Sequence, residues 1–126
     1  MQKTVVFDFD GVIHKYSKGW NDGSIYDIPV DGIYEVLGKL KIKGYKIVVV
    51  STRCANEESK SEMKAWLDRY GFNGLIDEIS ATKPPAIVYV DDRAICFDAN
   101  EINSLVYKID NFKTWQQKSD NFNIKW

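Results

Sequence analysis

The sequence is poor in the residues that cross-link small folds or bind soft metals. Its 126 residues include two cysteines, Cys54 and Cys96, and a single histidine, His14. A disulfide framework is therefore not expected, and neither is a zinc site built from cysteine and histidine. We assign no role to either cysteine, and we expect any bound metal to be held by oxygen ligands.

Long hydrophobic runs and an excess of one charge are also missing. The apolar stretch before the first acidic residue covers only residues 5–7, which is too short for a secretory signal or a membrane-spanning helix. The 17 basic and 18 acidic residues give a net charge of -1, so no overall field draws the protein toward nucleic acid or a membrane. We expect a cytoplasmic protein without a membrane partner. Nucleic acid binding would need a local basic patch, and the sequence does not indicate an oligomeric state.

What the chain does have is a regular alternation of strand and helix patterns. Hydrophobic residues make up 44% of the chain, and at this length one core can form but not two. Strand, helix, strand, helix and strand are predicted at residues 4–8, 31–43, 45–50, 57–70 and 86–92. The strands are apolar without alternation, as in strands buried on both faces. This order predicts an α/β fold, namely one Rossmann-like, doubly wound domain over residues 1–126 with helices on both faces of a parallel sheet.

The segments between these elements are less regular. Residues 13–29 are rich in glycine, asparagine, aspartate and serine, and we interpret this segment, the flap, as a loop or small hairpin. Asp31 is the expected N-cap of the first helix. Residues 75–80 are a weak strand candidate, and residues 94–112 are expected to add a short helix and an edge strand. No structure is predicted for the tail at residues 111–126.

All three strong strands end in polar or charged residues. The carboxyl ends of parallel strands meet at one edge of a sheet, where ligands bind. The residues expected there, including a lysine that precedes the third strand, are Asp8, Asp10, Ser51, Thr52, Arg53, Lys83, Asp91, Asp92 and Arg93. Each of them alone is common in turns, helix caps and surface ion pairs. Their joint occurrence in this order indicates a site.

This set of residues suits phosphoryl transfer, which requires positioning and neutralisation of charge. A carboxylate can attack phosphorus and form an aspartyl-phosphate, while a second acid moves protons. Mg²⁺ prefers carboxylate oxygens and would relieve the repulsion between the two acid pairs. A hydroxyl group and a lysine can bind the remaining phosphoryl oxygens.

The segments VVFDFDGVI, VVVSTR and VYVDDRA, together with Lys83, resemble the four motifs of the haloacid dehalogenase-like hydrolase superfamily. The resemblance spans residues 4–94. It implies that Asp8 is the nucleophile and a Mg²⁺ ligand. It also implies that Asp10 is the general acid/base and offers its backbone carbonyl to the metal.

The same resemblance implies roles for the later motifs. Ser51 is implied as the hydroxyl that binds the phosphoryl group, with Thr52 as the alternative if the strand ends one residue later. Lys83 is implied to neutralise the nucleophile and the transferred phosphoryl group. Asp92 best matches the direct metal ligand and Asp91 an indirect one, but the order of these two acids stays open.

The gaps between motifs leave no room for a cap domain, so the chain resembles small capless members from phages and bacteria. The implied function is a Mg²⁺-dependent phosphomonoesterase with an open site. Its phosphorylated substrate is not identified; a nucleotide, a polynucleotide end or another accessible phosphate would fit. The flap contains cations and aromatics that could bind a base, although an ordinary solvated hairpin is the favoured interpretation. Arg53 and Arg93 are better candidates for binding a distal phosphate.

Two non-enzymatic alternatives stay open. A receiver-like signalling domain also combines an acid pair, Mg²⁺, a hydroxyl residue and a lysine on a parallel sheet. It would place its phosphorylated aspartate at the end of a middle strand, where this chain has Ser51. The second alternative is a degenerate hydrolase fold kept as a binding module, which the presence of all motif residues disfavours.

Overall fold

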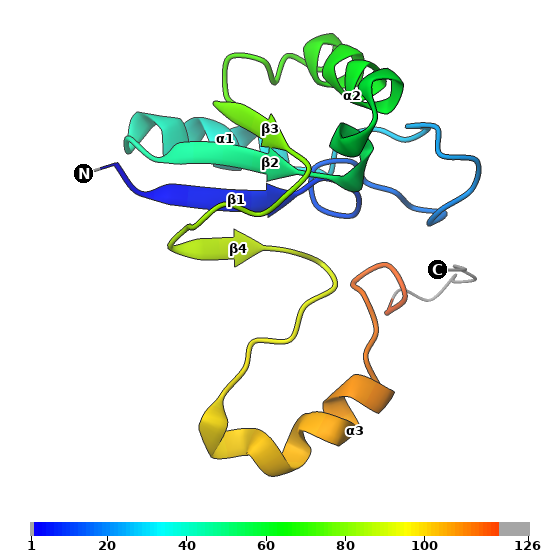
Figure 1. The fold of residues 1–126 in the computed structure, drawn as a ribbon, viewed down its shortest axis with the longest axis vertical. Helices are drawn as coiled ribbons and strands as arrows, with labels where there is room; N and C mark the ends of the chain where they lie inside the picture. Colours follow the sequence, from blue (N-terminus) through cyan, green and yellow to red (C-terminus); the bar gives the residue numbers. More distant parts are fainter. Residues whose placement is uncertain (1, 119–126) are drawn as a thin grey trace.

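The computed structural model describes residues 2–118 and shows a single α/β domain. Four strands form one parallel sheet in the order β3-β2-β1-β4 (Figure 1). The strands are β1 (Thr4–Asp8), β2 (Lys46–Val50), β3 (Glu78–Ser80) and β4 (Val88–Val90). The helices are α1 (Ile33–Ile42), α2 (Glu57–Arg69) and α3 (Leu105–Asp110), with two 3-10 helices, η1 (Thr52–Ala55) and η2 (Ala99–Ser104). The Rossmann-like α/β class predicted from the sequence is confirmed.

The main core lies between the sheet and the two long helices. Its buried side chains include Val5, Phe7, Ile33, Leu37, Ile47, Val49, Met63, Trp66 and Leu67. Both α1 and α2 cover this one face, because the connections from β1 to β2 and from β2 to β3 step across the sheet in the same direction and with the same hand. Helices on both faces were predicted. The second face, with Val6, Val48 and Val50, instead packs against Ala86, on the segment that leads from β3 to β4.

The two long helices begin differently from each other. The expected N-cap at Asp31 is wrong: α1 begins after Gly32, which has a φ of 84° and provides no side-chain cap. The α2 helix is capped by Asn56, whose side-chain oxygen accepts hydrogen bonds from the backbone N–H groups of Glu58 (2.9 Å) and Ser59 (3.2 Å). An amide in this position satisfies N–H groups that have no partner inside the helix.

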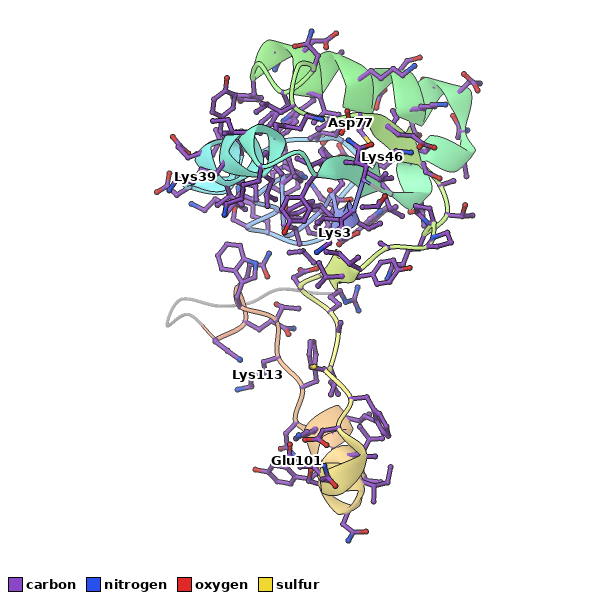
Figure 2. All side chains as sticks on the ribbon, turned by 90° about the vertical axis from the view of Figure 1, so that its left-hand side faces the viewer. Lys3, Lys39, Lys46, Asp77, Glu101 and Lys113 are labelled. Atoms are coloured by element: carbon purple, nitrogen blue, oxygen red, sulfur yellow. The ribbon has the colours of Figure 1, made fainter. Side chains whose placement is uncertain are left out.

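β4 and the segment after it depart furthest from the prediction. A buried strand was expected, but β4 is an edge strand whose Val88 and Tyr89 are 46% and 43% exposed. After β4, residues 95–112 form an arm that contains η2 and α3 and extends away from the sheet (Figures 1 and 2). The predicted short helix is present as α3, whereas the arm contains no edge strand. Exposed apolar side chains on the arm are Phe97, Ile102, Val106, Tyr107, Ile109 and Phe112.

No helix within residues 2–118 is long and apolar enough to cross a membrane. The tail at residues 111–126, for which no structure was predicted, begins inside the described part of the chain. Residues 115–118 form turns that return to the flap, where Gln116 donates a hydrogen bond from Nε2 to the backbone carbonyl of Lys15 at 3.2 Å. The rest of the tail, residues 119–126, lies outside the described residues.

Candidate functional site

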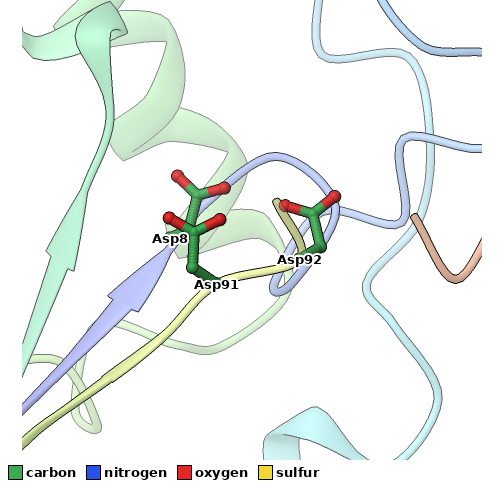
Figure 3. Close-up of side chains that lie close together, drawn as sticks. All are labelled: Asp8, Asp91 and Asp92. Atoms are coloured by element: carbon green, nitrogen blue, oxygen red, sulfur yellow. The ribbon is translucent and has the colours of Figure 1, made fainter. Parts of the chain in front are cut away.

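The strand order reverses between β1 and β4, because the chain adds β2 and β3 on one side of β1 and then β4 on the other. Ligands of parallel α/β sheets bind at the carboxyl ends of the strands beside such a reversal. Asp8 is the last residue of β1, and Asp91 and Asp92 directly follow β4. One carboxylate oxygen from each of the three lies within 4.8 Å of the other two (Figure 3). Three of the predicted metal ligands are therefore brought together.

The carboxylates of this cluster repel one another. Burial, followed by the negative charges of Asp91, Asp92 and Asp10, raises the pKa of Asp8 to about 8. Burial and Asp91 raise the pKa of Asp92 to about 6. Both carboxylate oxygens of Asp92 are buried and accept no hydrogen bond from the described part of the chain. A bound divalent cation would remove this repulsion, and the all-carboxylate donor set fits Mg²⁺.

Gly11 makes this arrangement sterically possible. Its φ of +87° lies in the left-handed region, and a β-carbon at this position would lie 2.0 Å from Oδ2 of Asp92. Any other residue would therefore push the Asp92 carboxylate out of the cluster, as well as straining the backbone. The glycine that follows the two aspartates in the sequence thus has a direct role in the geometry of the site.

Asp10 belongs to a separate network beside the cluster. Arg53 donates to both of its carboxylate oxygens, from Nε (3.0 Å) and Nη2 (3.1 Å). His14 contacts the same carboxylate through Nδ1 at 2.8 Å, and its Nε2 accepts the backbone N–H of Asp27 at 3.1 Å. We therefore assign the ring proton to Nδ1, as a donor to Asp10. Burial works to raise the pKa of Asp10, but the hydrogen bonds from His14 and Arg53 hold it below its usual range.

His14 was missed as a site residue in the sequence. Its side chain is fully buried, and its ring packs against those of Phe9 and of Trp66 in α2 at centroid distances of 5.6 Å. The spacing of four residues from Asp10 was the one available signal. A single histidine in a loop is weak support for a site, because its partner depends on how the loop folds back.

The remaining predicted site residues surround the two aspartate groups. Lys83 lies beside Asp91, with Nζ 3.2 Å from Oδ2. Ser51 is buried at the start of η1, where its hydroxyl oxygen accepts the backbone N–H of Arg53 at 3.1 Å. Thr52 is exposed and lines a pocket beside Asp8. The alternative hydroxyl, Thr52, is therefore the one that faces the open side of the site.

A pocket of about 400 Å³ opens beside Asp8. Residues that line it include Asp8, Asp10, Trp20, Thr52, Arg53 and Arg93. The flap forms one wall and is tied to the site by Arg53, which donates from Nη1 to the carbonyl of Gly23. Predicted residues from the ends of three strands and aromatic residues of the flap thus share one cavity.

A contact from the far end of the chain completes the loop after β1. The indole N–H of Trp115 donates to the backbone carbonyl of Gly11 at 2.7 Å. The segment that follows the arm is therefore attached to the same loop that carries Asp10 and Gly11. No pattern in the tail of the sequence predicts this contact.

No family model and no curated protein matches this chain. The resemblance to haloacid dehalogenase-like hydrolases therefore stays a prediction from the motifs.

Proposed function

We propose that the protein is a Mg²⁺-dependent phosphomonoesterase of the haloacid dehalogenase-like type, acting through an aspartyl-phosphate at Asp8. The observation that carries the proposal is the cluster of Asp8, Asp91 and Asp92 at the reversal of the strand order, with Lys83 on its edge. A cluster of unneutralised carboxylates beside an open pocket destabilises the fold. A role in binding a cation together with an anionic substrate would explain why the protein has this cluster.

In the first step, a carboxylate oxygen of Asp8 attacks phosphorus. The bond between phosphorus and the ester oxygen breaks, and its electron pair stays on this leaving oxygen. Asp10 supplies the proton that this oxygen needs, from the protonated form that the second step of the previous turnover leaves. In the second step, Asp10 takes a proton from water as the water oxygen attacks phosphorus, and the bond to Asp8 breaks to release phosphate. Mg²⁺ held by Asp8, Asp91 and Asp92 would neutralise negative charge in both steps.

The other residues of the site position these groups. Arg53 and His14 fix the orientation of the Asp10 carboxylate through three hydrogen bonds. Its lowered pKa favours the base role of the second step. Lys83 places a positive charge 3.2 Å from Asp91, and an ammonium group of this kind can bind phosphoryl oxygens.

Phosphate release from p-nitrophenyl phosphate tests this proposal. Wild-type protein should release phosphate with Mg²⁺ and stop when the metal is chelated, and Asp8→Asn should be inactive. Asp68→Asn is the matched control, because this acid is exposed on α2, and it should retain activity. Equal rates for wild type and Asp8→Asn would refute the proposal. A long-lived acyl phosphate formed from acetyl phosphate without turnover would favour the receiver-like alternative instead.

A further inference from the structure

The pocket beside Asp8 has an aromatic wall as well as charged groups. Trp20 and Tyr16 of the flap both line it, and the side chain of Trp20 is 64% exposed. A large indole that is open to solvent offers extensive apolar surface to a ligand. Here it stands in the same cavity as the proposed nucleophile.

Hydrogen bonds hold the flap backbone on both sides of Trp20. The hydroxyl of Tyr26 accepts the backbone N–H of Lys18 at 2.9 Å and donates to the carbonyl of Gly19 at 2.7 Å. On the other side, Arg53 donates to the carbonyl of Gly23. Trp20 therefore lies between anchored residues rather than at the tip of an unsupported loop.

Tyr16 is fixed more firmly still. It is only 7% exposed, and its ring stacks on that of Tyr26 with the centroids 6.1 Å apart and the planes inclined by 27°. The Tyr16 part of the aromatic wall is thus supported by a second ring, that of Tyr26. A preorganised aromatic surface of this kind binds flat rings with little loss of side-chain entropy.

Charge and size narrow the choice of ligand. Arg93 lines the pocket and brings positive charge near the phosphate end. The volume of about 400 Å³ lies near the lower end of small-molecule sites, roughly 300–1,000 Å³. It suits one nucleotide unit rather than a length of duplex. A sugar phosphate would fill the charged end but offer no flat ring to the indole.

We infer that the substrate is a nucleoside carrying a terminal phosphate monoester, with its base stacked on Trp20 and its phosphate at Asp8. This inference rests on the proposed function and names the substrate class of the same site. Stacking on an aromatic side chain is sequence-tolerant, so both purine and pyrimidine nucleotides should be accepted.

Adenosine 5′-monophosphate and ribose 5-phosphate make a direct comparison, because they differ only at C1, which carries the base in the nucleotide and a hydroxyl group in the sugar phosphate. Wild-type protein should favour the nucleotide in kcat/KM by about ten- to hundredfold. Trp20→Ala should remove this preference, whereas Trp20→Phe should keep most of it. Tyr107→Ala, which removes an exposed aromatic side chain from the arm, should leave the preference unchanged. Equal use of both substrates by wild type, or an unchanged preference in Trp20→Ala, would overturn the inference.

Calorimetric binding to Asp8→Asn in the presence of Mg²⁺ separates this inference from the phosphatase proposal. Tighter binding of the nucleotide than of ribose 5-phosphate, lost when Trp20→Ala is added, supports nucleotide recognition even if no substrate is hydrolysed. Hydrolysis of p-nitrophenyl phosphate without any base preference keeps the phosphatase and overturns the nucleotide assignment. A 5′-phosphorylated oligonucleotide shows whether the nucleotide is bound free or at the end of a strand. A Trp20-dependent preference for the oligonucleotide over the mononucleotide supports the inference and assigns the site to strand ends.

Discussion

Gly11 and Asp92 fit together so closely that a β-carbon on Gly11 would lie 2.0 Å from Oδ2 of Asp92. The loop after β1 and the loop after β4 therefore meet at a point where no side chain can be added. This contact sets the position of one of the three clustered carboxylates. The metal affinity of the site should depend on it.

Gly11→Ala should weaken Mg²⁺ binding roughly tenfold to hundredfold, since the methyl group displaces the Asp92 carboxylate. Mg²⁺ affinity measured by calorimetry checks this. Gly38→Ala is the matched control: Gly38 lies within α1, has ordinary helical φ, and a β-carbon there meets no atom within 4 Å. Alanine at position 38 should raise stability by about 0.5–1 kcal/mol and leave metal binding intact. Wild-type affinity in Gly11→Ala would contradict the proposed geometry.

Magnesium should stabilise the folded protein, and more so at mildly alkaline than at mildly acidic pH. The pKa of Asp8 is raised from 3.8 to about 8 and that of Asp92 from 3.8 to about 6. Between pH 3.8 and the raised pKa values, the metal-free folded state therefore binds more protons than the unfolded state. The stability that the two protonated groups contribute is fully present below pH 3.8. It is lost as the pH rises through about 6 for Asp92 and about 8 for Asp8.

Thermal unfolding with and without Mg²⁺ at two pH values measures this effect. The increase in Tm caused by the metal should be larger at the higher pH, where it relieves the repulsion between ionised carboxylates. Asp92→Asn should reduce the increase, because it removes one ligand. An equal increase in wild type and Asp92→Asn would show that the metal binds elsewhere.

Arg53→Lys should lower kcat for p-nitrophenyl phosphate by about tenfold or more, with a smaller effect on KM. Lysine cannot replace the two-pronged contact of the guanidinium with Asp10, so the carboxylate loses its fixed orientation. Steady-state kinetics provide the measurement. Arg69→Lys, an exposed exchange of the same type on α2, should behave as wild type. Full kcat in Arg53→Lys would remove the arginine from its positioning role.

The different N-termini of α1 and α2 predict different losses of stability when the polar residue at each is replaced by alanine. Asn56→Ala should destabilise the protein by about 1 kcal/mol, because the backbone N–H groups of Glu58 and Ser59 lose their acceptor. Asp31→Ala should change the free energy of unfolding by less than about 0.5 kcal/mol, because α1 has no side-chain cap. Urea unfolding of both variants checks the difference. A larger loss in Asp31→Ala would restore the aspartate as the cap.

The central part of the fold was predictable because its signals are local. The apolar runs in β1 and β2, and the helical spacing of Met63, Trp66 and Leu67, give their structure directly. β4 shows the limit of such signals. Its residues are as apolar as those of β1, but their exposure depends on what covers them, and no helix packs over this edge in the described chain.

The candidate site was predictable in its acids and not in its hydrogen bonds. Asp8, Asp91 and Asp92 converge because a parallel sheet brings its strand ends together, which the order of motifs already implied. The partnership of Arg53 with Asp10 joins positions 43 residues apart through the path of a loop. No spacing rule gives such a contact. The proposed binding of a distal phosphate by Arg53 and Arg93 stays a prediction.

The hydrogen bond from Trp115 to Gly11 has a consequence for synthesis of the protein. It joins positions 104 residues apart, so it forms only after nearly all of the described chain has emerged from the ribosome. A nascent chain can pair β1 with β2 and bury most of its core well before that moment. Its loop with Asp10 and Gly11 stays without this last contact. The newly made domain should therefore gain its fold before it gains a finished site.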